Sequence, residues 1–313
     1  MKKKFSTVIA ILLISGPVSH AQDFEGYRSS NYVGINGVFF NPSSIADSRH
    51  RWDFNLATVG LVAATDAAKI NFQTFKSLND SSETFDLFFG DLKKDNNVKV
   101  AANILGPSLM FNLGKGSALA LTSRVRLMMN MRHLDGHLTN QILGEENSND
   151  LYEIKSDNNM QVNANGWSEF GLTYARNLVS NGKHFLKGGI SLKYLSGKAN
   201  SFISISKLQG KIDSNTGTLY DAQGSIEQSI GGIEIENTDI SDLISFKNTG
   251  FGGDIGLTYE YRDEKFNSES DEENKYRFKV GMSLLDVGKN KYNADQKNAL
   301  NYKYTSLPTA LST

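Results

Sequence analysis

Residues Leu119–Arg132, LALTSRVRLMMNMR, alternate between two kinds of side chain. The mainly apolar set is Leu119, Leu121, Ser123, Val125, Leu127, Met129 and Met131. The other set is Ala120, Thr122, Arg124, Arg126, Met128, Asn130 and Arg132. A β-strand sends successive side chains to opposite faces, whereas a helix would scatter both sets around its circumference. The segment is therefore predicted to be a strand with one apolar face and one cationic face.

The same alternation recurs along the chain. It is clear in residues 168–176, 185–196, 251–262 and 276–285. Two noisier segments are 52–65 and 98–113, and Pro107 interrupts the second, where we expect a bulge or a poorly paired position. Each candidate strand is long enough to cross a bilayer at a tilt, for which about 9–11 residues suffice. Aromatic residues near the strand ends suggest the girdles found at membrane interfaces: Trp52, Trp167, Tyr174, Tyr194, Tyr259, Tyr261 and Tyr276.

The N-terminus has the pattern of a cleaved signal peptide. Three lysines precede an apolar run at 8–14, then Gly16-Pro17, and Ser19 and Ala21 are the small residues of a cleavage site before Gln22. The alternative, a membrane anchor, needs a longer apolar run. The chain has no cysteine, which excludes disulfides and a lipoprotein anchor. No later stretch resembles a transmembrane helix, so a membrane location requires a closed β-barrel.

The predicted connections alternate in length. Short or medium turns are expected at 114–116, 177–183 and 263–275, and long loops at 66–97, 133–166, 197–249 and after Asp286. This asymmetry is typical of outer-membrane barrels. We therefore expect an all-β, antiparallel transmembrane barrel in the outer membrane of a Gram-negative bacterium. The signal peptide would be 1–21, a latch or plug 22–51 and the barrel domain 52–313. A soluble two-layer β protein would show the same local alternation and is the alternative.

If the apolar faces contact lipid, the charged faces line the interior. The expected basic lumen residues are Arg124, Arg126, Arg132, Lys187, Lys193, Arg277 and Lys279, and the acidic ones are Glu169, Asp254 and Glu260. They could form a cationic lumen for anionic or amphipathic solutes such as fatty acid carboxylates. The favoured interpretation is an ionic network that fills and stiffens the barrel, since lumen charges of both signs are normal in such proteins.

Other chemistry has little support in the sequence. His133 and His137 are four residues apart, but Gly136 lies between them and a loop follows, so no metal site is predicted. No nucleophile elbow, P-loop or dinucleotide fingerprint is present, so we expect neither an enzyme nor a bound cofactor. The 33 basic and 34 acidic residues nearly cancel, which gives no reason to expect nucleic acid as a partner. The phenylalanine-rich loop 66–97 could cap the barrel or bind a partner.

A resemblance adds to this reading. Residues 34–61, GINGVFFNPSSIADSRHRWDFNLATVGL, are similar to FadL-like outer-membrane barrels of Bacteroidota, and most closely to a family recorded as a domain of unknown function. The turn Asn41, Pro42, Ser43 resembles the Asn-Pro-Ala motif of these barrels, and 283–292, SLLDVGKNKY, resembles a strand end of the uncharacterised family. FadL-like barrels contain more strands, so we expect this chain to be C-terminally truncated.

The resemblance implies a set of functions and partners. Broader relatives include the long-chain fatty acid transporter and the PorV protein of type IX secretion. The first implies that hydrophobic small molecules are bound or transported and that the segment 22–51 plugs the barrel. The second implies a non-enzymatic scaffold for secretion-system or surface proteins. A purely structural barrel is a third possibility, and in all three cases outer-membrane lipids are partners.

Overall fold

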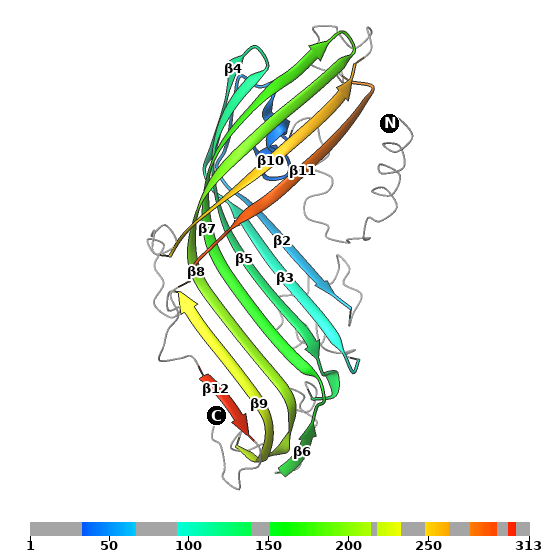
Figure 1. Ribbon diagram of the computed structural model, residues 1–313, viewed down its shortest axis with the longest axis vertical. Coiled ribbons are helices and arrows are strands. Elements are labelled where there is room, and N and C mark those ends of the chain that lie inside the picture. The colour runs from blue at the N-terminus through cyan, green and yellow to red at the C-terminus, as the bar shows by residue number, and fades with distance from the viewer. Residues whose placement is uncertain are drawn as a thin grey trace, which may run out of the picture.

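The computed structural model describes residues 33–66, 93–138, 151–213, 218–232, 248–262, 276–292 and 300–304 (Figure 1). These residues form one twelve-stranded sheet in which every strand pair is antiparallel. The all-β antiparallel fold class is confirmed. No helix in these ranges is long and apolar enough to cross a membrane. The predicted signal peptide and most of the loop 66–97 lie outside the described residues.

The strands follow one another along the chain. They are β1 (Trp52–Asn55), β2 (Thr58–Thr65), β3 (Asn96–Leu105), β4 (Ser108–Gly114), β5 (Ser117–Leu134), β6 (Leu151–Lys155), β7 (Asn159–Asn181), β8 (His184–Asp213), β9 (Leu219–Gly232), β10 (Thr249–Tyr261), β11 (Phe278–Lys289) and β12 (Leu300–Tyr304). β3 and β4 lie end to end, because they pair with successive parts of β5. The expected interruption at Pro107 is confirmed, because β3 ends just before it and β4 begins just after it. Similarly, β9 and β10 pair with successive parts of β8.

Cross-strand register joins the apolar faces into continuous rows. One row runs through Trp52, Phe111, Leu119, Tyr174, Ile190, Ile255 and Leu284. The next runs through Phe54, Leu109, Leu121, Leu172, Leu192, Gly253 and Val287. Most of the large apolar side chains in both rows are exposed, with Leu192 63 % accessible. The sheet therefore has a broad, uncovered apolar face, which we call the apolar band.

The opposite face is polar and largely buried. Thr173, Ser191 and Asp254 alternate with residues of the apolar band, and each is at most 2 % exposed. Two short 3-10 helices, η1 (Gly34–Phe39) and η2 (Pro42–Ile45), cover this face and contact strands from β1 to β10. In Figure 1 they are the blue turns beside β10. We call residues 33–51 the plug, and the polar face of the sheet that η1 and η2 contact the interior face.

A small hydrophobic core fixes the plug to the sheet. The plug contributes Ile35, Val38, Ile45 and Ala46, and the sheet contributes Met110, Ala118, Ala120 and Ala175. Three of the four sheet residues are alanines, so the plug backbone can approach the strands closely. This part of the interior face is therefore a packed core.

Two predicted loops contain long strand segments. Residues 133–166 and 197–249 were expected to be loops, but they contain β6, β9, the start of β7 and the second half of β8. Their sequences contain many Asn and Gly residues, which have low strand propensity. Pairing among β7, β8 and β9 satisfies their backbone groups and outweighs that propensity. These strands form a long arm that extends beyond β10 and β11 (Figure 1).

Two aromatic residues do not lie where a girdle would place them. Trp167 lies two residues before Glu169 on β7, so strand alternation places its indole on the interior face, where its Nε1 atom donates a hydrogen bond to Glu169. Tyr276 precedes β11 and lines a cavity beside the plug. At the adjacent ends of β10 and β11, the Tyr261 ring stacks on the Phe278 ring.

Candidate functional site on the interior face

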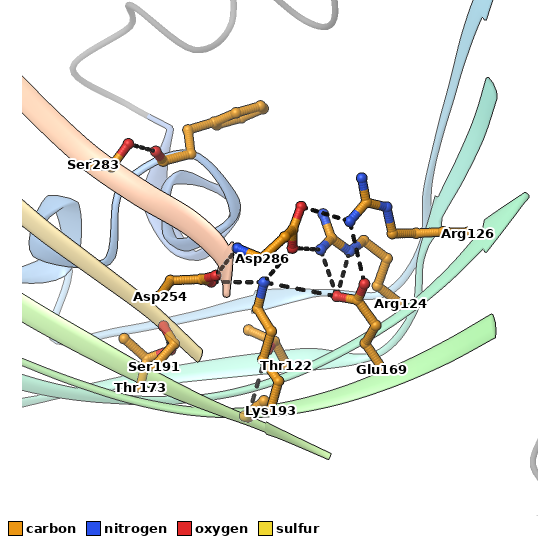
Figure 2. A network of polar contacts seen from close by, with 12 residues as sticks. Thr122, Arg124, Arg126, Glu169, Thr173, Ser191, Lys193, Asp254, Ser283 and Asp286 are labelled. Atoms are coloured by element: carbon orange, nitrogen blue, oxygen red, sulfur yellow. Dashed lines mark hydrogen bonds and ion pairs between the residues drawn. The ribbon is translucent and has the colours of Figure 1, made fainter. Parts of the chain in front are cut away.

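A cluster of charged side chains lies on the interior face, at the edge of the plug (Figure 2). Arg124 on β5 and Glu169 on β7 are register partners. The Arg124 Nε and Nη2 atoms donate to Glu169 Oε2 at 3.0 and 2.5 Å. Both side chains are less than a tenth exposed. A buried charge is tolerated when it is paired in this way.

The cluster extends to three further strands. Lys193 Nζ lies 2.7 Å from Asp254 Oδ2 and 2.8 Å from Asp286 Oδ1. Arg126 Nη1 lies 2.8 Å from Asp286 Oδ2 and 3.4 Å from Glu169 Oε1. We call the six residues Arg124, Arg126, Glu169, Lys193, Asp254 and Asp286 the charge network. Its three cations and three carboxylates cancel, which favours the network interpretation over a cationic lumen.

Asp286 was missed by the sequence analysis. Strict alternation along β11 would place it on the same face as Leu284. A register shift between Gly253 and Ile255 and a positive φ of 58° at Asp286 turn its carboxylate inward. Its backbone N–H also donates to Asp254 Oδ1 at 2.7 Å. The only signal in the sequence is an acidic residue inside an otherwise apolar strand.

A second cluster ties the plug to the sheet. Lys187 Nζ lies 2.6 Å from Glu260 Oε1, and Arg262 Nη2 lies 2.6 Å from both Glu260 Oε2 and Asp47 Oδ2. The Arg262 guanidinium also lies 3.8 Å from the centre of the Phe185 ring. Asp47 and Arg262 were not among the predicted site residues. Asp47 belongs to the plug, so its role depends on tertiary contacts that periodicity does not reveal.

Three predicted lumen residues do not join either cluster. Arg132 and Arg277 are exposed, and within the described residues neither forms an ion pair. Lys279 is exposed as well, and its ammonium lies 5.3 Å from the centre of the Tyr276 ring. His133 Nδ1 lies 3.2 Å from Asp95, and the described parts of the chain contain no group of three or more potential metal ligands.

The turn Asn41, Pro42, Ser43 sits on bare backbone of the sheet. Asn41 Oδ1 accepts hydrogen bonds from the Ser43 N–H at 2.9 Å and the Ser43 hydroxyl at 2.7 Å, which caps η2. Asn41 Nδ2 donates to Leu257 O at 3.1 Å. A Cβ on Gly189 would overlap the Pro42 backbone, and one on Gly256 would overlap Asn41. The turn therefore depends on these glycines.

Two cavities flank this arrangement. The first, of about 220 Å³, lies between the plug and β8, β10 and β11, and includes Asp47, Lys187 and Lys279 in its lining. The second, of about 360 Å³, lies on the other side of the charge network. Its lining includes Arg126, Met128, Asn130, Asn165, Trp167, Leu195 and Tyr292. The second cavity is large enough for a small ligand.

Comparison with known proteins identifies one family. Residues 42–309 match the sequence model of a family described as "Family of unknown function (DUF5723)". The match begins at Pro42, within the Asn-Pro turn, and includes the whole charge network and all residues that line the second cavity. No curated protein and no solved structure matches the chain.

Proposed function

The chain belongs to the family of unknown function DUF5723, and we propose that it is a FadL-like outer-membrane β-barrel protein that binds small molecules in its interior. The apolar band is the observation that carries this proposal. A water-soluble protein rarely exposes a contiguous apolar patch of this extent, because water penalises it. A lipid bilayer removes that penalty.

The height of the apolar band fits a bilayer. On β10 the outward apolar residues run from Phe251 to Tyr261. At about 3.3 Å per residue this is about 33 Å along the strand, or about 25 Å across a membrane at a tilt of about 40°. That value is close to the height of the lipid-facing band of outer-membrane barrels.

The band also runs obliquely across the strands. On β11 the exposed apolar residues run from Phe278 to Val287, and Leu284 lies in the same register row as Trp52. On β1 and β2 the exposed residues begin at Trp52 and continue to Leu61. Strands tilted to the membrane normal require such a displacement of a level band from one strand to the next. A flat packing face in a soluble sandwich has no such requirement.

The interior supports a ligand-binding role rather than an open pore. The plug and the charge network fill the region near the short turns, and the second cavity lies beyond them. The proposal extends to hydrophobic or amphipathic small molecules, as the resemblance implies. The predicted signal peptide provides the route of export, and Bacteroidota are the expected source.

A second candidate, a PorV-like scaffold for secreted or surface proteins, is favoured by the arm. The arm has its own small core of Leu138, Ile154, Met160 and Leu208. A packed core makes the arm a stiff surface outside the apolar band, which suits a protein partner. Co-purification of a secretion component that depends on the arm would favour this role over ligand binding.

The membrane claim has a direct test. The full reading frame is expressed with its N-terminal segment, outer membranes are isolated, and samples are run on a gel with and without boiling. We expect the protein in the outer-membrane fraction with faster migration when unboiled, because a folded barrel resists detergent. Recovery as a soluble periplasmic protein without a shift would contradict the proposal and favour the two-layer soluble fold.

A further inference from the structure

The segment 286–292 forms the inner wall of the second cavity. Asp286 leaves the regular strand geometry at its positive φ, and the chain then runs close to the backbone of neighbouring strands. A Cβ on Gly288 would overlap the Phe251 carbonyl, and one on Gly197 would lie 2.8 Å from the Tyr292 ring. These glycines hold the segment against the sheet. The cavity wall is therefore built by close packing and does not depend on a loose loop.

The interior charges beside this cavity are already neutralised. Lys289 also lines the cavity, but it is the register partner of Phe251, so its side chain lies on the apolar face of the sheet. Arg126 and Lys193 each contact two carboxylates of the charge network at 3.4 Å or less. A ligand anion would therefore add an uncompensated negative charge beside Glu169 and Asp286. An uncharged ligand avoids this penalty.

Unused hydrogen-bonding groups face the same cavity. Both side-chain hydrogen bonds of Arg126 come from Nη1, which leaves the Nη2 group without a partner among the described residues. Figure 2 shows one terminal nitrogen of Arg126 directed away from both carboxylates. The Asn130 amide likewise has no hydrogen bond within the described ranges. Asn165 donates to Asn163 and accepts from Asn200, and retains one N–H for a ligand.

Ring faces and apolar groups complete the lining. Trp167 and Tyr292 contribute aromatic rings, and Met128 and Leu195 contribute apolar atoms. The Tyr292 hydroxyl donates to Gly166 O at 3.4 Å, which orients the ring across the cavity. Aromatic rings beside amides suit a ligand with an apolar C–H face and hydroxyl groups at its edge.

We propose that the second cavity binds an uncharged, hydroxylated ring of the sugar type, with Arg126, Asn130 and Asn165 at its hydroxyls and Trp167 or Tyr292 at its C–H face. This inference rests on the proposed interior ligand-binding function. Its ligand class, a hydroxylated ring with an apolar C–H face, differs from the hydrophobic molecules that the resemblance implies.

The chain has two tryptophans, so the cavity can carry its own reporter. Trp52 is exposed on the apolar band, and the variant Trp52→Phe leaves Trp167 as the sole indole. The full-length variant is purified in dodecyldimethylamine oxide, which has no sugar headgroup. Trp167 fluorescence is then titrated with glucose, N-acetylglucosamine, glucuronate and decanoate. Calorimetric titration of the protein with Trp52 intact gives the same comparison independently.

We expect saturable binding of a neutral sugar at millimolar concentrations or below. Replacing Asn130 or Asn165 with alanine should weaken the affinity for the sugar roughly ten-fold, because each substitution removes one hydrogen bond and a typical hydrogen bond changes an affinity by about that factor. Asn97→Ala is the matched control, because its amide bonds Asp66 away from the cavity. Its affinity should be unchanged.

The remaining outcomes distinguish a failure of the sugar proposal from a failure of the proposed interior ligand binding. Binding of glucuronate or decanoate without either neutral sugar would overturn the ligand class and leave interior ligand binding supported. If none of the four probes binds by either method, both the ligand class and the ligand-binding part of the proposed function are contradicted. The membrane location would still stand or fall on the gel-shift experiment.

Discussion

The Asn41 side-chain oxygen occupies the space where a side chain at Gly256 would stand. The same asparagine donates from Nδ2 to the Leu257 carbonyl at 3.1 Å, so it is held against bare strand backbone. The Asn-Pro turn of the plug therefore requires glycine at position 256 of β10. The plug is therefore a fitted part of the fold.

The first prediction concerns this fit. Gly256→Ala should displace the Asn41 turn and destabilise the plug by about 1–3 kcal/mol, as overpacking does. Hydrogen–deuterium exchange of residues 34–45 should become faster. Gly252→Ala is the matched control on the same strand and face, where the added Cβ would make only an ordinary contact at 3.5 Å. Equal exchange in both variants would show that Gly256 does not hold the plug.

The second prediction concerns the charge network. Glu169→Gln removes the carboxylate that Arg124 and Arg126 share, and leaves Arg124 only the longer 3.6 Å contact to Asp286. Breaking a buried ion pair in this way should lower the free energy of unfolding by about 3–5 kcal/mol. Urea titration in lipid vesicles measures this change.

A surface ion pair provides the comparison. Asp95→Asn removes the partner of His133, and both of these side chains are more than half exposed. Its cost should be within about 1 kcal/mol. If Glu169→Gln costs no more than Asp95→Asn, the network does not stabilise the sheet.

The third prediction concerns the apolar band. Leu192→Arg places a charge in the middle of the exposed apolar rows and should cost about 2–4 kcal/mol in a bilayer. The amount of folded, heat-modifiable protein in the outer membrane should fall. Tyr220→Arg places the same charge at an exposed position on the arm and should leave that amount unchanged. Normal assembly of Leu192→Arg would argue against lipid contact at this row.

The fourth prediction concerns the pH dependence of Asp66, which directly follows β2. Burial raises the pKa of the Asp66 carboxyl, but hydrogen bonds from the Asn97 backbone and side chain outweigh burial and lower that pKa below its usual 3.8. A carboxyl whose pKa is lower in the folded state than in the unfolded state stabilises the fold at pH values above the unfolded pKa. This stabilisation is lost as the pH falls through the folded-state pKa. Protection of the Asn97 amide, the ratio of its intrinsic to its observed exchange rate, should fall only below about pH 4. The same loss of protection at neutral pH in Asp66→Asn, and not in Asp95→Asn, would support the assignment.

The strands were predictable because each carries its own signal. Alternation in Leu119–Arg132 specifies a strand, its phase and its buried face, and β5 has all three as expected. Pro107 also marks an interruption, because proline has no backbone N–H to donate to a neighbouring strand. The arm was less predictable, because its many Asn and Gly residues have low strand propensity and its strands are stabilised by pairing with their neighbours.

The site was predictable in part for the same reason. Arg124, Glu169, Lys193 and Asp254 follow strict alternation, and the structure brings them together. Asp286 depends on a bulge, which changes the phase of the strand after it. Asp47 depends on how the plug docks, which only the folded protein reveals.

The central claim is that the apolar band contacts lipid. The chain contains no cysteine, so a single spin label can be placed at Leu121→Cys, Leu192→Cys or Tyr220→Cys without further substitution. Collision of each label with oxygen and with a water-soluble nickel complex is measured in isolated outer membranes. At positions 121 and 192 we expect frequent collision with oxygen and little with nickel, and at position 220 the reverse. Nickel accessibility at 121 and 192 as high as at 220 would contradict the lipid-facing assignment.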